Sequence, residues 1–161
     1  MKNKFLVVFI IVFLIILGFF YHRYQVPPNI DFPNLELTTI SGESVSLQDF
    51  SEKPILINFY QSWCGPCLQE MPSLAELSAD KDLKVICISD ESAEVIQKVA
   101  DRFPSNILFL KMKGNRKEIG IYTIPTTYLI NQKGKKVLEK IGGEDWNSGE
   151  MKSELKVLLN R

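Results

Sequence analysis

PILINFYQSWCGPC, residues 54–67, places an apolar run directly before two cysteines that are separated by two residues. The run predicts a buried central strand, and the pattern after it predicts a helix that continues to about Ser78. Cys64 then lies at the N-terminus of this helix, where unpaired backbone N–H groups and the helix dipole favour a thiolate. Cys67 follows one turn later, where it can resolve a mixed disulfide formed by Cys64. The stretch therefore predicts a site where a disulfide is made and broken.

The composition is that of one globular domain without excess charge. Of 161 residues, 45% are hydrophobic and 24% are charged, and 19 basic residues balance 19 acidic ones. A neutral chain offers no strong field for nucleic acid, so we expect no nucleic-acid partner. The single histidine, His22, lies beside an N-terminal apolar segment. The rest of the chain therefore lacks the imidazole of a Cys-His hydrolase, a His-ligated zinc site or a His-ligated haem. We expect no metal and no cofactor.

The N-terminal apolar segment predicts a single membrane-spanning helix. Residues 5–21 carry no charge, and a helix of this length extends about 25 Å, a little less than the hydrocarbon thickness of a bilayer. A cleaved secretion signal is the alternative, but residues 18–22 are mostly bulky, unlike a cleavage site. We therefore divide the chain into a membrane anchor at 1–23, a Pro-containing linker at 24–33 and a globular domain at 34–161.

Basic residues before the predicted span indicate its orientation. Lys2 and Lys4 precede the apolar run, and positively charged residues favour the cytoplasmic side of a membrane. We therefore expect a single-pass protein of the cell membrane with its N-terminus in the cytoplasm. The globular domain would lie on the extracytoplasmic or periplasmic side, where disulfide chemistry operates.

The rest of the chain predicts strands that alternate with helices. Beyond the central strand, we expect a strand at 83–89, a helix at 91–103, a strand at 106–111, a short helix at 115–122 and a closing helix at 146–160. Hairpins are expected at 35–47 and at 126–141. This order predicts an α/β fold with a mixed sheet covered on both faces.

Four segments together resemble the thioredoxin-like superfamily, and within it the membrane-anchored TlpA/ResA/CcmG-type thiol–disulfide oxidoreductases. They are the hairpin at 32–47, the strand at 55–60, the segment from Trp63 to Pro72 and the segment 120–130 with Ile124-Pro125-Thr126. A CxxC pair alone is a weak signal, whereas this combination is specific. The resemblance covers the chain from about residue 29 onward. It implies a three-layer thioredoxin-like fold with an N-terminal β-hairpin and a helix–strand insert at about 90–112.

The resemblance implies that Cys64 and Cys67 form the redox-active disulfide. Cys64 is expected to attack a substrate disulfide, and Cys67 to resolve the mixed disulfide. A structural zinc site has little support, because zinc takes four ligands and only Cys87 remains. We interpret Cys87, in the middle of an apolar run, as a small buried hydrophobic residue. A permanent structural disulfide is the alternative that the sequence leaves open.

Trp63, Ile124 and Pro125 are the expected substrate-binding residues. Trp63 fits either a partly exposed wall beside the disulfide or a core aromatic at the end of a strand. In proteins of the resembled type, the peptide bond that matches Ile124-Pro125 is cis, and its loop lies against the cysteines. The backbone of the residue before the proline is then free to pair with a substrate strand. The sequence alone also allows an ordinary trans proline at the start of a strand.

Glu70 is the expected proton carrier. It lies three residues after Cys67 and therefore on the same face of the predicted helix. Resolution requires Cys67 to become a thiolate, and a nearby carboxyl group can take its proton. In thioredoxin a buried Asp on the central strand has this role, but the matching Asn58 cannot ionise, whereas Glu70 matches a glutamate of ResA-like proteins. The alternative is an exposed helix glutamate without a role in the chemistry.

These residues predict an extracytoplasmic thiol–disulfide oxidoreductase that acts as a reductase. The Gly-Pro pair between the cysteines matches reducing thioredoxin, although the reduction potential does not follow from the sequence. The resemblance further implies protein substrates with disulfides or thiols, among them apocytochrome c, and a role in cytochrome c maturation. It also implies a membrane thiol transporter of the DsbD/CcdA type as electron donor. We expect a monomer.

Two other activities occur on the same fold and are kept as alternatives. A thiol peroxidase would carry a threonine three residues before its reactive cysteine, where this chain has Gln61. A copper-delivery chaperone usually has a CxxxC motif and a distal histidine, and the sequence has neither. Both alternatives therefore have less support than thiol–disulfide exchange.

Overall fold

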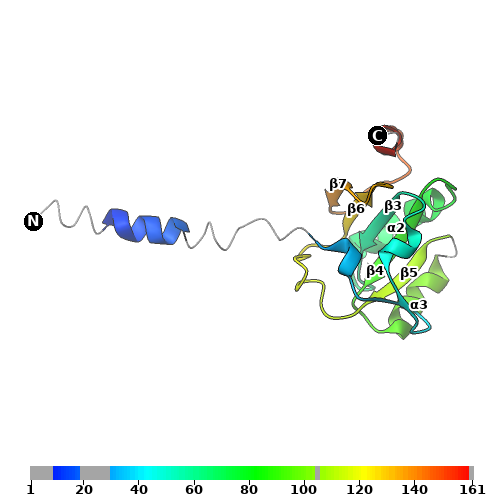
Figure 1. The fold of residues 1–161 in the computed structure, drawn as a ribbon, viewed down its shortest axis with the longest axis horizontal. Coiled ribbons are helices and arrows are strands. Elements are labelled where there is room, and N and C mark those ends of the chain that lie inside the picture. Colours follow the sequence, from blue (N-terminus) through cyan, green and yellow to red (C-terminus); the bar gives the residue numbers. More distant parts are fainter. Residues whose placement is uncertain (1–8, 19–29, 104–105, 160–161) are drawn as a thin grey trace, which may run out of the picture.

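The computed structural model describes residues 9–18, 30–103 and 106–159 (Figure 1). Residues 9–18 are helical, and the globular domain begins with the short 3-10 helix η1 (Phe32–Asn34). The elements that follow are β1 (Leu37–Thr39), β2 (Ser44–Val45), the 3-10 helix η2 (Leu47–Phe50), β3 (Ile55–Phe59), α2 (Gly65–Leu77), β4 (Lys84–Ser89), α3 (Ala93–Arg102), β5 (Leu108–Met112), β6 (Thr126–Ile130), β7 (Lys136–Ile141) and α4 (Gly149–Leu159).

The strands form one mixed sheet in the order β2-β1-β5-β4-β3-β6-β7. The three central strands β3, β4 and β5 are parallel, whereas β6, β7 and the hairpin β1–β2 pair antiparallel. Helices α2 and α3 make the crossovers that parallel neighbours require. The carboxyl ends of β3 and β4 therefore meet at the same end of the sheet, which brings the loop before Cys64 next to the loop at Asp90.

Two hydrophobic cores flank the sheet. Helices α2, α3 and α4 pack against one face, where Leu74, Ile96 and Leu155 belong to one core. The short helices η1 and η2 and the loop after β5 cover the other face, with Leu47 and Ile121 in the second core. Strand β3 lies between the cores and is buried along its whole length. This position explains why its sequence is a continuous apolar run rather than an alternating one.

The structure confirms the mixed α/β sheet, the N-terminal hairpin and the helices expected at 91–103 and 146–160. The helix and strand expected within 90–112 are α3 and β5. Strand β5 is not appended to the edge of the sheet, because it lies between β4 and β1 and pairs with both. The polar face of α3 is exposed, and its buried residues Ile96 and Val99 point into the first core.

The prediction of a short helix at 115–122 is wrong. The segment forms turns, in which the N–H of Glu118 donates to Asn115 at 2.9 Å and that of Ile121 donates to Arg116 at 3.0 Å. Gly114 (φ +82°) and Gly120 (φ +86°) adopt left-handed backbone conformations close to its two ends. Such residues terminate helices, and the few residues between them are too short to sustain one.

The predicted membrane anchor is described only in part. Residues 9–18 form a helix whose apolar side chains are exposed. Within the described ranges, no helix has both the length and the apolar character needed to cross a bilayer. The flanks of the predicted anchor, 1–8 and 19–23, lie outside the described residues, as does most of the predicted linker at 24–33.

Candidate active site

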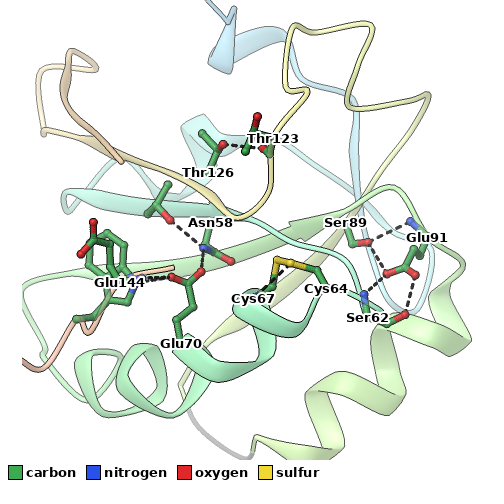
Figure 2. The surroundings of a disulfide bond; sticks show 12 residues. Asn58, Ser62, Cys64, Cys67, Glu70, Ser89, Glu91, Thr123, Thr126 and Glu144 are labelled. Carbon is green, nitrogen blue, oxygen red and sulfur yellow. Dashed lines mark hydrogen bonds between the residues drawn. A yellow bond between two sulfur atoms is a disulfide. The ribbon is translucent and has the colours of Figure 1, made fainter. Parts of the chain in front are cut away.

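Cys64 and Cys67 form a disulfide at the N-terminus of α2 (Figure 2). Cys64 is the N-cap residue, and its sulfur accepts a hydrogen bond from the backbone N–H of Cys67 at 3.2 Å. The predicted position of Cys64 is therefore confirmed. After reduction, the same N–H group and the helix dipole would stabilise a Cys64 thiolate. Cys64 is 5% exposed and Cys67 is fully buried, so Cys64 is the more exposed of the two cysteines.

Trp63 lies beside the disulfide with 69% of its surface exposed. This exposure is that of a residue outside the core, so the interpretation of Trp63 as a core aromatic is wrong, and the partly exposed wall beside the disulfide stays a prediction. Tyr122 is similarly exposed at 68% and lies in the loop that contains Pro125. Sequence reasoning missed Tyr122, although an aromatic residue three positions before the proline was a visible signal.

The Ile124-Pro125 peptide bond is cis, as the resemblance implies. Two hydrogen bonds hold the loop on either side of the proline. Thr126 Oγ1 donates to the carbonyl oxygen of Thr123 at 2.7 Å, and the N–H of Gly142 donates to the carbonyl oxygen of Pro125 at 2.8 Å. Figure 2 shows the Thr123–Thr126 contact. Ile124 is partly buried and packs against both cores. The loop is thus fixed at the start of β6, next to the strand that leads to the cysteines.

Glu70 is buried, with 3% of its surface exposed, so the interpretation as an exposed helix glutamate is wrong. Its Oε1 accepts a hydrogen bond from Asn58 Nδ2 at 2.7 Å. Its Oε2 accepts two more, from the backbone N–H of Glu144 at 3.0 Å and from Trp146 Nε1 at 3.1 Å. Burial raises the pKa of Glu70, and this effect outweighs the hydrogen bonds, which lower it. Glu70 therefore binds a proton more readily than an exposed glutamate does.

Asn58 connects Glu70 to the central sheet. It is fully buried on β3, where its neighbours in register are Cys87 on β4 and Thr127 on β6. Its Nδ2 donates to Thr127 Oγ1 at 2.8 Å as well as to Glu70. Sequence reasoning treated Asn58 only as a residue that cannot ionise. A single polar residue in an otherwise apolar strand was the signal of a buried hydrogen-bond network.

Cys87 is free and fully buried, which confirms its interpretation as a small buried residue. Burial raises the pKa of its thiol well above the ordinary value, so the reactive thiolate form is disfavoured. Within the described part of the chain, no three His, Cys, Asp or Glu side chains gather in a way that could hold a metal ion.

Two acidic residues after β4 hold the loop before the cysteines. Glu91 accepts hydrogen bonds from the backbone N–H and the hydroxyl of Ser62, both at 2.7 Å, and from the hydroxyl of Ser89 at 3.1 Å (Figure 2). Asp90 accepts a hydrogen bond from the side-chain amide of Gln61. These contacts fix the backbone that leads into Trp63. The sequence did not predict them, because two acidic residues directly after a strand look the same as those of an ordinary solvated loop.

Asp90 also pairs with Arg116 from the turn segment 115–122. The backbone N–H of Arg116 donates to its Oδ2 at 2.9 Å, and the guanidinium lies 3.5 Å from the same oxygen. Burial opposes ionisation of Asp90, but the hydrogen bonds from Arg116 and Gln61 and the charge of Arg116 outweigh it. The pKa of Asp90 is therefore lowered. Asp90 stays charged and structural.

A groove of about 570 Å³ opens beside the first turns of α2. Pro66, Glu70 and Ser73 line one wall, and Gly143 and Glu144 belong to the other. The walls approach closely at Gly143, where an added Cβ would lie 3.3 Å from the carbonyl oxygen of Pro66. A glycine thus lets the loop before α4 pack against the dipeptide between the cysteines.

Comparison with known proteins agrees with this geometry. Residues 28–137 match the AhpC/TSA family. The chain belongs to this family. The Thioredoxin-like protein YneN of Bacillus subtilis is 35% identical over 131 residues, which cover 76% of this chain and 75% of that protein. The Thiol-disulfide oxidoreductase ResA of Bacillus cereus is 32% identical over 134 residues, which cover 79% of this chain and 76% of ResA.

Among solved structures, a secreted Mycobacterium tuberculosis disulfide oxidoreductase homologous to E. coli DsbE has a TM-score of 0.63 at 18% identity, covering 82% of this chain and 98% of that chain. This likeness, with the observed sheet, confirms the thioredoxin-like fold. This member of the AhpC/TSA family is a thiol–disulfide oxidoreductase of the ResA type, with Cys64 and Cys67 as its CxxC pair.

Proposed function

We propose that this AhpC/TSA family member reduces disulfides in protein substrates on the extracytoplasmic side of the cell membrane. The proposal rests chiefly on one observation, the Cys64–Cys67 disulfide at the N-terminus of α2 with a buried glutamate one turn further along the helix. This arrangement supplies an accessible sulfur, a protected sulfur and a proton acceptor.

The reaction begins with the dithiol form. The Cys64 thiolate attacks one sulfur of the substrate disulfide, a mixed disulfide forms, and the other substrate sulfur leaves as a thiolate. Glu70 takes the proton of Cys67, whose electron pair stays on its sulfur. The Cys67 thiolate then attacks the sulfur of Cys64, forms the Cys64–Cys67 disulfide and releases the second substrate thiolate. Two electrons pass from the dithiol to the substrate.

Trp63, Ile124 and Pro125 bind the substrate in this proposal. Exposure of Trp63 next to the disulfide supports a contact with the chain that flanks a substrate cysteine. The hydrogen bonds on either side of Pro125 fix the backbone around Ile124 at the start of β6. An extended substrate segment would pair with this backbone.

We also propose a membrane anchor at 1–23, with the N-terminus in the cytoplasm. The uncharged run 5–21, the basic residues before it and the exposed apolar helix at 9–18 support this placement. Apocytochrome c is the proposed client and a membrane thiol transporter the proposed electron donor, by analogy with the resembled oxidoreductases. The domain would act as a monomer.

The geometry favours exchange over peroxidase chemistry. At the position where a peroxidase would carry a threonine hydroxyl, Gln61 is buried and its amide donates to Asp90. That position therefore serves to hold the loop before the cysteines.

Trapping of mixed disulfides tests the proposal. The full-length Cys67→Ser protein, expressed in its native host, is expected to accumulate covalent protein adducts that a reductant releases. The Cys64→Ser protein is the control and should accumulate none. Absence of adducts in both variants would overturn the proposal. So would a Cys64–Cys67 disulfide that resists glutathione with a potential below about −300 mV, which is typical of a structural bridge.

A further inference from the structure

Asn58 lies between the sheet and the active-site helix. It projects from β3 on the same face as Leu56 and Tyr60, two residues of the core that also contains Cys67. The residue is fully buried, so its amide group must find its partners within the protein.

The orientation of the Asn58 amide follows from its neighbours. The amide nitrogen faces Glu70, which is the orientation that an ionised carboxylate requires, because such a group accepts hydrogen bonds and cannot donate them. Both hydrogens of this nitrogen are used, one toward Glu70 Oε1 at 2.7 Å and one toward Thr127 Oγ1 at 2.8 Å. The amide oxygen therefore points away from both partners.

This oxygen is buried and has no hydrogen-bond partner among the described residues. Figure 2 shows it on the side of Asn58 that faces the disulfide. The sulfurs of a disulfide carry no hydrogen and cannot donate to it. Reduction changes this, because a thiol of Cys67 is a donor that is itself fully buried and needs an acceptor.

We propose that Asn58 is a positioning residue for Cys67. Its Oδ1 accepts a hydrogen bond from the S–H group of reduced Cys67, while its Nδ2 donates a hydrogen bond to the Glu70 carboxylate. One amide then places the thiol proton and its acceptor side by side. The benefit of this contact for the reaction rests on the proposed function, because the proton that Asn58 positions is the one that Glu70 takes. The contact between Asn58 and the thiol does not depend on that role.

A direct test observes the S–H group itself. In the full-length Cys64→Ser, Cys87→Ala protein, Cys67 carries the single S–H, whose infrared stretching band lies at lower frequency when it is hydrogen-bonded. We expect this band at the hydrogen-bonded position, and at the free position after the further change Asn58→Leu. In Thr127→Val, which removes only the other partner of the amide, the band should stay. A band at the free position in the background protein, or one unchanged by Asn58→Leu, would overturn the inference.

The redox equilibrium gives a second readout. The hydrogen bond exists only in the dithiol, so its loss in Asn58→Leu should shift the equilibrium with glutathione about fivefold toward the disulfide. This corresponds to a potential about 20 mV more negative. Thr127→Val should stay within twofold of the natural protein. Equal shifts in the two variants would show a general loss of packing and would contradict the inference.

A further variant covers the case in which Asn58→Leu does not fold. Asn58→Asp keeps an oxygen at the same place, so the Cys67 band should remain at the hydrogen-bonded position, and a free band would overturn the inference. The proposed function fails on different evidence, namely the absence of substrate adducts in Cys67→Ser. The infrared result is the same whether or not a substrate is present.

Discussion

Glu70 and Asp90 are two mostly buried carboxylates near the active-site disulfide, and the protein shifts their pKa values in opposite directions. Figure 2 shows Glu70 on one side of the disulfide and Glu91, the neighbour of Asp90, on the other. The partners of Glu70 are neutral N–H groups, and burial prevails. At Asp90 the hydrogen bonds from Arg116 and Gln61, together with the charge of Arg116, outweigh burial, so its charged form prevails. Glu70 has no cation among its hydrogen-bond partners. In the proposed mechanism Glu70 therefore takes up the proton, whereas Asp90 supports the loop before the cysteines.

The largest effect is expected for Glu70→Gln on the resolution step. Without a carboxylate to take the Cys67 proton, release of substrate from the mixed disulfide should slow about 100-fold near pH 7. Rapid-mixing measurements of the released substrate thiol, taken across a range of pH, report this rate. Asp90→Asn is the matched control and should stay within about threefold of the natural rate. Equal slowing in the two variants would erase the proposed distinction between the sites.

Asp90→Asn should instead reduce stability. Loss of the charge leaves the Arg116 guanidinium partly buried without its carboxylate, at a cost of about 1–3 kcal/mol in the free energy of unfolding. The pKa of Asp90 is lowered by folding, so its contribution is present above the unfolded pKa and is lost as pH falls through the folded pKa. Urea unfolding at several pH values should therefore show a difference that shrinks toward acid pH. A constant difference would contradict this account of Asp90.

Glu70 should give the opposite pH dependence. Its folded pKa is raised, so the folded state binds the proton more tightly than the unfolded chain. That contribution is fully present below the unfolded pKa and is lost as pH rises through the folded pKa. Relative to Glu70→Gln, the natural protein should therefore lose stability over this range. Urea unfolding of the oxidised forms of both proteins at several pH values measures this difference in stability. If the natural protein instead gained stability with rising pH, the raised pKa of Glu70 would be contradicted.

The smallest effect is expected for Gly143→Ala. The added Cβ would lie 3.3 Å from the carbonyl oxygen of Pro66, so the loop before α4 would have to move by a few tenths of an ångström. The N–H of Glu144, the next residue, donates to Glu70. The pKa of Glu70 should therefore shift slightly while that of Asp90 stays unchanged. Carboxyl carbon NMR titration of both residues checks this, and a shift confined to Asp90 would contradict the separation of the two sites.

The sequence predicts the parts of the site that depend on neighbours along the chain. The strand, the cysteines at the start of a helix and Glu70 one turn after Cys67 all follow from local periodicity and capping. The cis state of Pro125 came from the resemblance alone, because the residues themselves allow either isomer. The short helix at 115–122 failed because two glycines with left-handed backbones interrupt it.

The contacts that tune the site join residues far apart in the chain, and local patterns do not reveal them. Glu70 and Trp146 are separated by 76 positions, and Asn58 and Thr127 by 69. Asp90 reaches Gln61 across 29 positions because β3 and β4 are parallel neighbours. Only the register of the sheet and the packing of the loop before α4 bring these groups together.

The pKa of Glu70 in the reduced protein, read from the NMR signal of its carboxyl carbon, decides whether this residue carries the proton of Cys67. We predict titration above the ordinary glutamate value of about 4.3, and the rate of substrate release should follow the same titration. If Glu70 titrates at or below that value, and the rate of substrate release does not follow its titration, the buried carboxylate does not carry the proton of Cys67.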